Sequence, residues 1–380
     1  MTRRRDVSNS SGTDPGRRSP SWLRGKSSSP RAFSQSDAGP RSLVMSTRDW
    51  LLIAVTAVAL TPLAFFTFLP WIIQPLFRLL LLPHYRLRIE GQDHVPRTGP
   101  VLFAANHVSW IDGFILAASC PRRGRILINA DFLRWPLLGL IGRRAGLIAV
   151  PFSGGRTVRG AIRAAQKTLD DGQAIGLFPE AQITRTGLLG PFYRGIEVIL
   201  AEHDSVPVIP VFLDNLWGSF FSFSGGRFFR SRPKARRRTV NVVFGAPVPP
   251  PITKFAVRQA VLIAGVRACE LRGSRPSPLE SIDPALPHLT HPELGPLTGS
   301  TLDLHIGNVH QIGHKPGSVG LPLPGVALRI VGTTEAALAQ EQQGRLQALV
   351  AGRQEWLDTG FQARLDHDGF LYLGATAPTK

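Results

Sequence analysis

Short apolar runs alternate with helical patterns between residues 84 and 273. Seven of the runs have the length and composition of strands: 86–90, 101–105, 125–129, 146–150, 174–178, 207–213 and 239–244. The clearest helix is predicted over 157–169, where apolar residues recur on one face and basic residues on the other. A second is predicted over 254–271, with Gly273 just beyond its last turn. Strands alternating with helices predict an α/β fold.

A long apolar segment precedes this region. From Trp50 to Phe77 there is no charged side chain, and a segment of this length can enter or cross a bilayer. Pro62, Pro70 and Pro75 are expected to break it into pieces. Because basic residues flank both ends, we expect a bent or re-entrant pair of membrane-associated helices within 47–83, with both flanks cytoplasmic. A buried core helix is the alternative.

Residues 1–46 are rich in Ser, Pro, Gly and Arg and poor in apolar residues, which predicts a disordered basic tail. No apolar segment follows the first arginines at the spacing of a secretion signal. Met45 stands just before the apolar segment, and our hypothesis is that the native protein begins there.

The formal net charge of +18 favours a polyanionic partner, such as nucleic acid, an anionic membrane or a phosphorylated cofactor. Residues 227–238 are strongly basic and follow an aromatic stretch, which suits both a membrane interface and single-stranded nucleic acid. The long apolar segment decides for the membrane, so no nucleic acid partner is expected. The two cysteines, Cys120 and Cys269, provide no disulfide framework or metal cluster, which allows a reducing compartment.

A polar stretch, Asn106-His107-Val108-Ser109-Trp110-Ile111-Asp112, directly follows the run 101–105. On one continuous helix, five positions amount to about 140° of rotation, so His107 and Asp112 would diverge. A turn followed by a helix start can bring them together, and we expect Ser109 as the N-cap with Asp112 at N3. A carboxylate beside an imidazole fixes its tautomer, so that the ring can take a proton from a hydroxyl. In the alternative interpretation Asp112 only caps the helix and His107 is an ordinary loop residue.

A second stretch, Phe178-Pro179-Glu180-Ala181-Gln182-Ile183-Thr184, follows the apolar run 174–177, at a strand end where open α/β sheets gather ligands. Together the two stretches resemble the phospholipid and glycerol acyltransferase family, whose blocks read NHxSxxD and FPEGTR. The resemblance covers roughly residues 86–250 and implies an acyltransferase-type mixed sheet flanked by helices. The form Phe-Pro-Glu-x-x-Ile-Thr is most similar to the acyltransferase part of bifunctional proteins that reacylate lysophosphatidylethanolamine.

The resemblance implies transfer of a fatty acyl group from acyl-CoA or acyl carrier protein to the free hydroxyl of a lysophospholipid or 1-acylglycerol 3-phosphate, at a membrane and with the active site facing the cytoplasm. His107 is the implied general base and Asp112 orients it. The implied substrate-binding residues are Asn106, Ser109, Phe178, Pro179, Glu180, Gln182, Thr184 and Arg185. No cofactor or metal is expected beyond the acyl donor, and the expected partners are membrane lipids, the lysophospholipid acceptor and that donor.

The chain departs from the family pattern after Glu180, where Ala181, Gln182 and Ile183 replace the expected glycine and arginine. In the family such arginines contact the phosphate of the acceptor. Arg156, Arg185 and Arg194 are the candidate substitutes.

Residues 274–300 contain several prolines and are interpreted as a linker. In 301–380, Gln311 to Val326 and Trp356 to Gly360 resemble segments of AMP-forming acyl-activating enzymes. The aspartate expected after Gly360 is Phe361, which cannot accept hydrogen bonds from a ribose. We therefore expect a small β-rich remnant without adenylation activity. The alternative function is a catalytically inactive membrane-associated scaffold derived from a bifunctional acyltransferase and synthetase.

Overall fold

The computed structural model describes residues 45–81, 83–130, 134, 139–140, 142, 147–150, 155–224, 226, 237–273, 281–306 and 309–374. The chain divides into two compact units, Met1–Ala57 and Val58–Lys380. Apart from Met45 and Ser46, the tail predicted to be disordered lies outside the described residues. So does most of the basic stretch 227–238.

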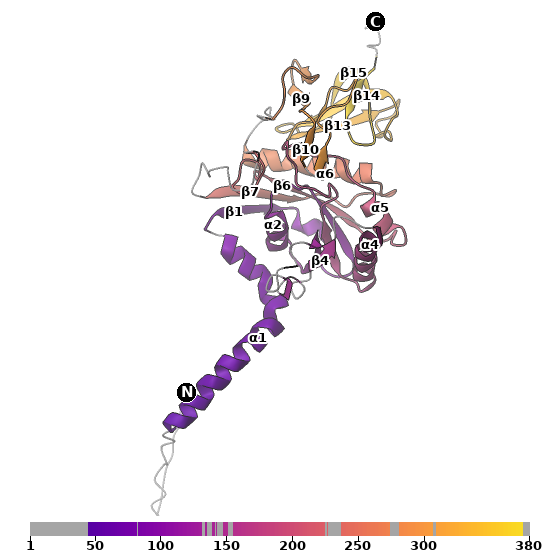
Figure 1. Cartoon of the computed structure of the whole chain (residues 1–380). Helices are drawn as coiled ribbons and strands as arrows, with labels where there is room; N and C mark the ends of the chain where they lie inside the picture. The colour runs from indigo at the N-terminus through magenta and orange to yellow at the C-terminus, as the bar shows by residue number, and fades with distance from the viewer. Residues whose placement is uncertain are drawn as a thin grey trace, which may run out of the picture. The chain divides into compact units, whose positions relative to one another are not determined.

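A seven-stranded sheet forms the centre of the second unit (Figure 1). Its strands, in spatial order, are β1 (Tyr85–Glu90), β7 (Arg238–Phe244), β6 (Val208–Asp214), β2 (Val101–Ala105), β5 (Ala174–Leu177), β3 (Gly124–Asn129) and β4 (Leu147–Val150). Only β6 and β7 pair antiparallel within it, and the other neighbours are parallel. All seven predicted strands are therefore present, and the α/β prediction with a mixed sheet is confirmed.

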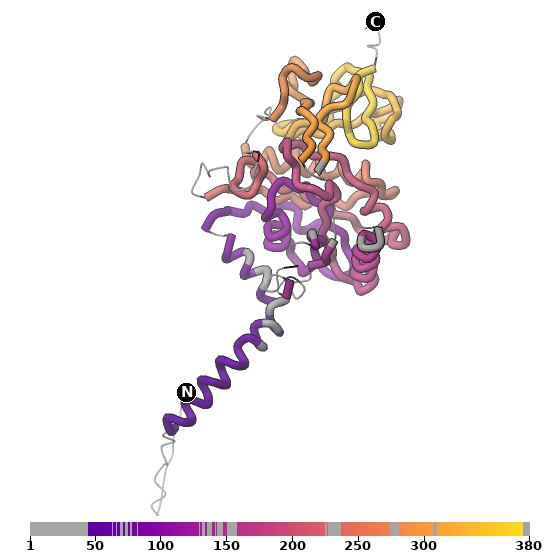
Figure 2. Tube along the Cα trace, in the orientation of Figure 1, coloured from indigo at the N-terminus to yellow at the C-terminus, as the bar shows by residue number. Residues whose placement is uncertain are grey.

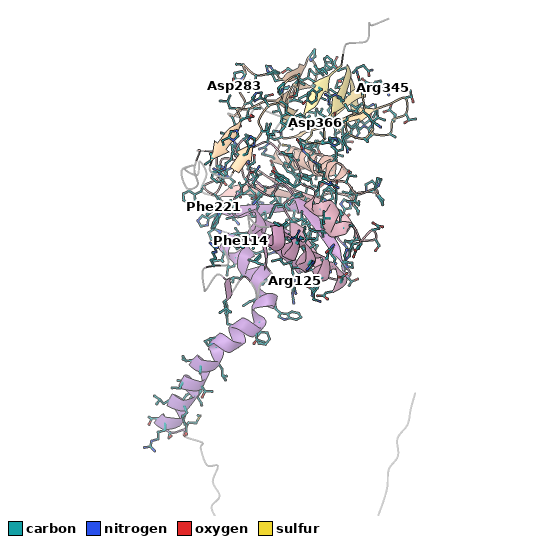
Figure 3. The ribbon with its side chains drawn as sticks, turned by 45° about the vertical axis from the view of Figure 1, so that its right-hand side comes forward. Phe114, Arg125, Phe221, Asp283, Arg345 and Asp366 are labelled. Atoms are coloured by element: carbon teal, nitrogen blue, oxygen red, sulfur yellow. The ribbon has the colours of Figure 1, made fainter. Side chains whose placement is uncertain are left out.

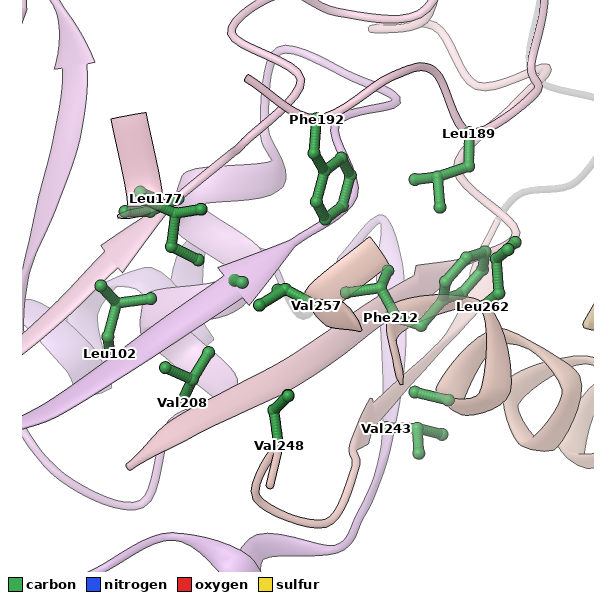
Figure 4. Packing of buried hydrophobic residues seen from close by; sticks show 14 of the residues in the cluster. Leu102, Leu177, Leu189, Phe192, Val208, Phe212, Val243, Val248, Val257 and Leu262 are labelled. Atoms are coloured by element: carbon green, nitrogen blue, oxygen red, sulfur yellow. The ribbon is translucent and has the colours of Figure 1, made fainter. Parts of the chain in front are cut away.

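Helices cover both faces of this sheet, which explains why β2 is apolar at every position. Leu102 and Ala104 belong to a buried cluster that also contains residues of α4 (Gly155–Asp170), α5 (Gly195–Leu200) and α6 (Lys254–Arg272) (Figure 4). Val101, Phe103 and Ala105 point the other way and pack with residues of α2 (Asp112–Ser119). Because the strand is fixed from both sides, its carboxyl end is a rigid support for the polar stretch that follows.

Helix α6 lies between the sheet and the C-terminal strands, as the traces in Figures 1 and 2 show. It begins where the Thr253 side chain accepts a hydrogen bond from the Ala256 amide, and it ends at Gly273, whose φ of 73° is left-handed. Gly265 lets the helix approach the sheet closely, because a Cβ at this position would lie 2.8 Å from the Phe212 ring. The helix predicted over 254–271 is confirmed.

Helix α1 (Thr47–Leu81) continues through Pro62, Pro70 and Pro75, so the predicted pair of shorter helices is wrong. An internal proline removes one backbone hydrogen bond and can bend a helix without ending it, because the hydrogen bonds on either side remain. Among the described residues, no helix is long and apolar enough to cross a membrane. The expected transmembrane segment is therefore not supported.

The C-terminal part of the chain is built from short antiparallel strands, as predicted. One sheet contains β12 (Leu321–Pro322), β9 (Gly295–Gly299) and β8 (Leu289–His291), and a larger one contains β13 (Val326–Val331), β14 (Gly344–Val350), β15 (Leu357–Leu365) and β16 (Leu371–Leu373). Strands β10 (Leu304–Ile306) and β11 (Val309–Gln311) pair with each other. We call residues 281–374 the C-terminal module. Strands β8 and β9 fall inside the stretch interpreted as a linker, so the module begins before residue 301.

Candidate active site

The structure brings His107 and Asp112 together at the carboxyl end of β2. The His107 Nδ1 atom lies 2.8 Å from Asp112 Oδ2. The Asp112 side chain is fully buried, whereas that of His107 is 20% exposed. Because a carboxylate can only accept, Nδ1 carries the proton, and Nε2 is left as the acceptor. The predicted pairing of the two side chains is therefore present, and the role of His107 in catalysis stays a prediction.

Asp112 also fixes the shape of the loop that carries His107. Its Oδ2 accepts hydrogen bonds from the amides of Val108 and Ser109, at 2.6 and 2.8 Å, and its Oδ1 accepts one from the Ser109 hydroxyl. The predicted Ser109 N-cap is wrong, because α2 begins at Asp112 with Ile111 in the cap position and no side-chain cap. The Ser109 hydroxyl donates to the carboxylate instead of accepting from the helix.

The second polar stretch holds His107 by its backbone. The His107 amide donates to Glu180 Oε1 at 2.7 Å, and the His107 carbonyl accepts from the Thr184 amide at 2.9 Å. The Phe178 ring stacks on the imidazole, with ring centroids 4.2 Å apart and an interplanar angle of 18°. Thus the loop after β5 fixes the amide, the carbonyl and one ring face of His107, the candidate general base.

Glu180 is buried and uses its carboxylate on the chain itself. Its second oxygen accepts the Gly190 amide at 2.8 Å. Burial raises the pKa of Glu180 to about 7, although the two amides and the nearby His107 and Arg258 favour the charged form. Glu180 therefore positions the histidine loop, and it also lines the cavity described below.

Arg258 is a residue of this site that the sequence analysis missed. It lies on α6 with 1% of its surface exposed, and it donates to the carbonyls of Leu189 and Gly190, each at 3.0 Å. Burial lowers its pKa to about 10, while Glu180, Asp366 and Asp368 raise it. The sequence contains a signal for Arg258, because this charged residue stands among apolar residues on the buried face of the predicted helix.

Three further predicted residues, Asn106, Pro179 and Thr184, form hydrogen bonds to the backbone of the chain. Both polar atoms of the Asn106 side chain bond the Leu213 backbone, at 2.7 and 3.1 Å, which ties the end of β2 to β6. The Pro179 carbonyl accepts the Tyr193 amide. Thr184 is buried and its hydroxyl donates to the Leu188 carbonyl.

The β10–β11 hairpin binds the loop after Glu180. The Gln182 side chain donates to the His310 carbonyl at 3.3 Å. The side chain of Gln311 accepts the Arg185 amide at 2.8 Å and donates to the Ile183 carbonyl at 3.0 Å. Ala181, which replaces the family's glycine, has a φ of 54°, in the left-handed region that glycine favours.

The three candidate substitutes for the missing arginine differ in their surroundings. Arg194 is exposed and pairs with Glu197 at 3.1 Å. The side chain of Arg156 lies outside the described residues. The Arg185 guanidinium lies 3.2 Å from the centroid of the Phe223 ring, and burial lowers its pKa.

A cavity of about 530 Å³ adjoins this site. Asn106, Val108 and Glu180 line one part of it, and Pro322 to Gly325 of the C-terminal module line another. Among the described residues no group of three or more His, Cys, Asp or Glu side chains is arranged to hold a metal ion.

Comparison with known proteins covers the same region. Residues 86–214 match the Acyltransferase family model. Both halves of the His107 site lie within the matched residues. The 1-acyl-sn-glycerol-3-phosphate acyltransferase of Neisseria gonorrhoeae is 40% identical over 93 residues, which is 24% of this chain and 35% of that protein. The lyso-ornithine lipid O-acyltransferase of Rhizobium meliloti (strain 1021) is 34% identical over 100 residues, 26% of this chain and 33% of that protein. The chain thus spans about a third of the length of these relatives.

Among solved structures, the 1-acyl-sn-glycerophosphate acyltransferase PlsC of Thermotoga maritima aligns with this chain. The alignment covers 63% of this chain and 88% of that one, at 20% identity and a TM-score of 0.41. A Bacillus subtilis o-succinylbenzoate coenzyme A synthetase aligns with a TM-score of 0.18 at 12% identity, covering 70% of this chain and 54% of that one. Both TM-scores lie below 0.5, so the assignment of the candidate site depends on the geometry of this chain.

Proposed function

We propose that the protein transfers a fatty acyl group from acyl-CoA or acyl carrier protein to the free hydroxyl of a lysophospholipid or 1-acylglycerol 3-phosphate. The observation that carries this proposal is the 2.8 Å contact between His107 and a fully buried Asp112 inside the region that matches the Acyltransferase family. The relatives whose names specify 1-acylglycerol 3-phosphate or a lyso-lipid as acceptor support the same class of reaction.

In this reaction His107 Nε2 takes the proton of the acceptor hydroxyl while Asp112 stabilises the imidazolium that forms. The alcohol oxygen attacks the thioester carbonyl, the C–S bond breaks, and the thiolate leaves with the proton that His107 returns. No covalent acyl-enzyme is needed, since the two substrates react directly when held together. The partial exposure of His107 gives the hydroxyl access to the ring.

For the phosphate of the acceptor, Arg185 is the residue we propose. It lies five positions after Glu180, and its guanidinium lies against Phe223. Its Nε is buried and has no hydrogen-bond partner among the described residues. A guanidinium that is fixed by an aromatic ring and retains free donors is suited to bidentate phosphate binding.

We propose that the site works at a membrane surface, with the reaction on the cytoplasmic side. Trp110, Phe114 and Phe220 are exposed by 40%, 38% and 36%. The Trp110 amide donates to the Phe221 carbonyl at 3.1 Å, which brings Trp110 beside the segment that contains Phe220. Figure 3 labels Phe114 and Phe221. Exposed aromatic side chains beside the site suit contact with lipid headgroups.

An assay of the purified full chain tests the function. Acyl-CoA and acyl carrier protein thioesters are each offered with 1-acylglycerol 3-phosphate, 2-acylglycerophosphoethanolamine and a lyso-ornithine lipid. The second acceptor is included because the Phe-Pro-Glu-x-x-Ile-Thr form and the C-terminal resemblance point to it. We expect transfer to at least one acceptor and a loss of about a thousandfold in His107→Ala. Silence with every pair would favour the inactive scaffold, whereas full activity of His107→Ala would contradict the role of His107 as the general base.

A further inference from the structure

We propose that a second pocket, at the start of β7, binds a phosphomonoester that also carries a hydroxyl group. The pocket has a volume of about 390 Å³ and is lined by Arg88, Arg237, Arg238, Arg272, Asn215 and Asn241, among other residues. Binding in this pocket is independent of the proposed function, whereas assignment of the ligand to one of the substrates rests on it.

The positive charge of this pocket is largely uncompensated. Of its four arginines, Arg272 is paired with a carboxylate, that of Asp214 at 3.5 Å, and the other three have no carboxylate partner in the described part of the chain. The C-terminal end of α6 contributes a partial negative charge of about half a unit, which the remaining three positive charges outweigh. A dianionic phosphate would be attracted there and stabilised by charge-assisted hydrogen bonds.

The guanidinium groups are held in place before a ligand arrives. Arg238 donates to the carbonyls of Asn215, Trp217 and Gly218 at 2.9 to 3.0 Å, and so anchors the loop after β6. Arg88 donates from Nη1 to the Leu271 carbonyl at 3.0 Å. Each guanidinium has five N–H donors, so these contacts leave donors for a phosphate while they reduce the entropy lost on binding.

Asn241 is the reason why the ligand is expected to carry a hydroxyl group. It is 1% exposed, and its Nδ2 donates to Asp214 at 3.1 Å and to the Ala268 carbonyl at 3.3 Å. Its Oδ1 is buried and has no donor among the described residues, although Asn241 lines the pocket. An unsatisfied buried acceptor costs about 1–3 kcal/mol, so a ligand hydroxyl that donates to it would add affinity.

The pocket is placed to serve the reaction centre. Its residues Asn215, Arg238 and Arg272 also line the cavity whose other walls include Asn106 and Glu180. The ribose 3′-phosphate of a coenzyme A donor has a neighbouring 2′-hydroxyl that is free to donate to Asn241. In contrast, the free hydroxyl of 1-acylglycerol 3-phosphate is the group that reacts at His107. The pocket therefore fits the phosphomonoester of the donor better than that of the acceptor.

Isothermal titration of the full chain at constant ionic strength tests the pocket. The probes are glycerol 3-phosphate for the acceptor, adenosine 3′,5′-bisphosphate for the donor, and sulfate, which has no hydrogen to donate. We expect one of the two phosphomonoesters to bind at one site and more tightly than sulfate. Arg88→Gln and Arg237→Gln should each weaken that binding about tenfold.

Arg125→Gln is the matched control, because Arg125 is an exposed arginine on β3 that bonds the Gln173 side chain, and its place is labelled in Figure 3. Its affinity should stay within about twofold of the parent. His107→Ala should retain probe binding, which separates the pocket from the proposed catalysis. The inference is overturned if neither phosphomonoester saturates, or if both pocket variants bind like the parent, and acyl transfer measured in parallel would then still stand on its own.

Discussion

The Asp112 carboxylate bonds groups of its own turn after β2, whereas the loop after β5 is held by side chains from distant parts of the chain. Asp112 bonds partners three to five positions away. In contrast, Arg258 reaches across 68 and 69 positions to the carbonyls of Gly190 and Leu189, and Gln311 across 126 and 128 positions to Arg185 and Ile183. The pairing of His107 with Asp112 thus forms within one turn, and the support of that turn is dispersed over other parts of the fold.

The largest effect is expected from Asp112→Asn. An asparagine amide group would face the Val108 and Ser109 amides, which are donors like itself, and it would no longer select the Nδ1-protonated form of His107. By analogy with catalytic triads, the turnover number should fall about 10⁴-fold. Steady-state kinetics with the best substrate pair measures this.

Ser109→Ala is the control for this change, because it removes one hydrogen bond to the carboxylate and leaves its charge. A fall of less than tenfold is expected there. If Asp112→Asn kept more than a tenth of the parent's turnover number, the role of Asp112 as the orienting group would be wrong.

Arg258→Met should have the next largest effect, mainly on stability. It leaves the buried Glu180 carboxylate without its neighbouring cation and the Leu189 and Gly190 carbonyls without their donor. Breaking such a buried set destabilises by about 3–5 kcal/mol. Denaturant unfolding of the variant measures the loss.

Arg267→Met provides the comparison on the same helix, since Arg267 is half exposed and pairs with Glu90 and Glu270 at the surface. A change of about 1 kcal/mol or less is expected for it. Equal losses in the two variants would show that the buried position of Arg258 has no special effect.

The contrast between the loops also decides what could be predicted from the sequence. All seven strands could be predicted from their apolar runs, because both faces of the sheet are buried. The helix before Gly273 could be predicted from its apolar pattern and from the glycine at its end. The pairing of His107 with Asp112 could be predicted because both lie within one turn. The start of α2 was misplaced, because the Asp112 carboxylate captures the Val108 and Ser109 amides in competition with a capping serine.

Distant contacts left little signal in the sequence. The hairpin carrying Gln311 comes from a region more than 120 positions after the loop that it holds, and no periodic pattern links the two. The sequence motif assigned Glu180 to the acceptor, but both carboxylate oxygens bond backbone amides. A motif specifies which residue type is needed, whereas its hydrogen-bond partners depend on how the loops meet in three dimensions.

The pH dependence of stability tests Glu180 directly. Burial raises the pKa of Glu180 to about 7 from its ordinary value of 4.5, so the folded state binds the proton more tightly than the unfolded state does. This contribution is fully present below about pH 4.5 and is lost as the pH rises to about 7, and a shift of this size corresponds to about 3 kcal/mol. Unfolding free energies measured from pH 4.5 to 8 should show the fall, and Glu180→Gln should flatten it. A parent curve that rises over this interval and matches that of the variant would contradict the assignment.

The smallest effect is expected from Gln311→Ala, which tests whether the C-terminal module supports the active site. The change removes the acceptor of the Arg185 amide and the donor to the Ile183 carbonyl, two hydrogen bonds worth about 1 kcal/mol each. Hydrogen exchange at the Arg185 amide should accelerate about tenfold, and acyl transfer should fall severalfold because the loop that holds His107 is less fixed. Gln342→Ala removes an exposed glutamine of the same module and should change neither rate. If Gln311→Ala accelerates exchange but leaves transfer unchanged, the loop after β5 tolerates this motion, and the local network around Asp112 is sufficient to hold the catalytic pair.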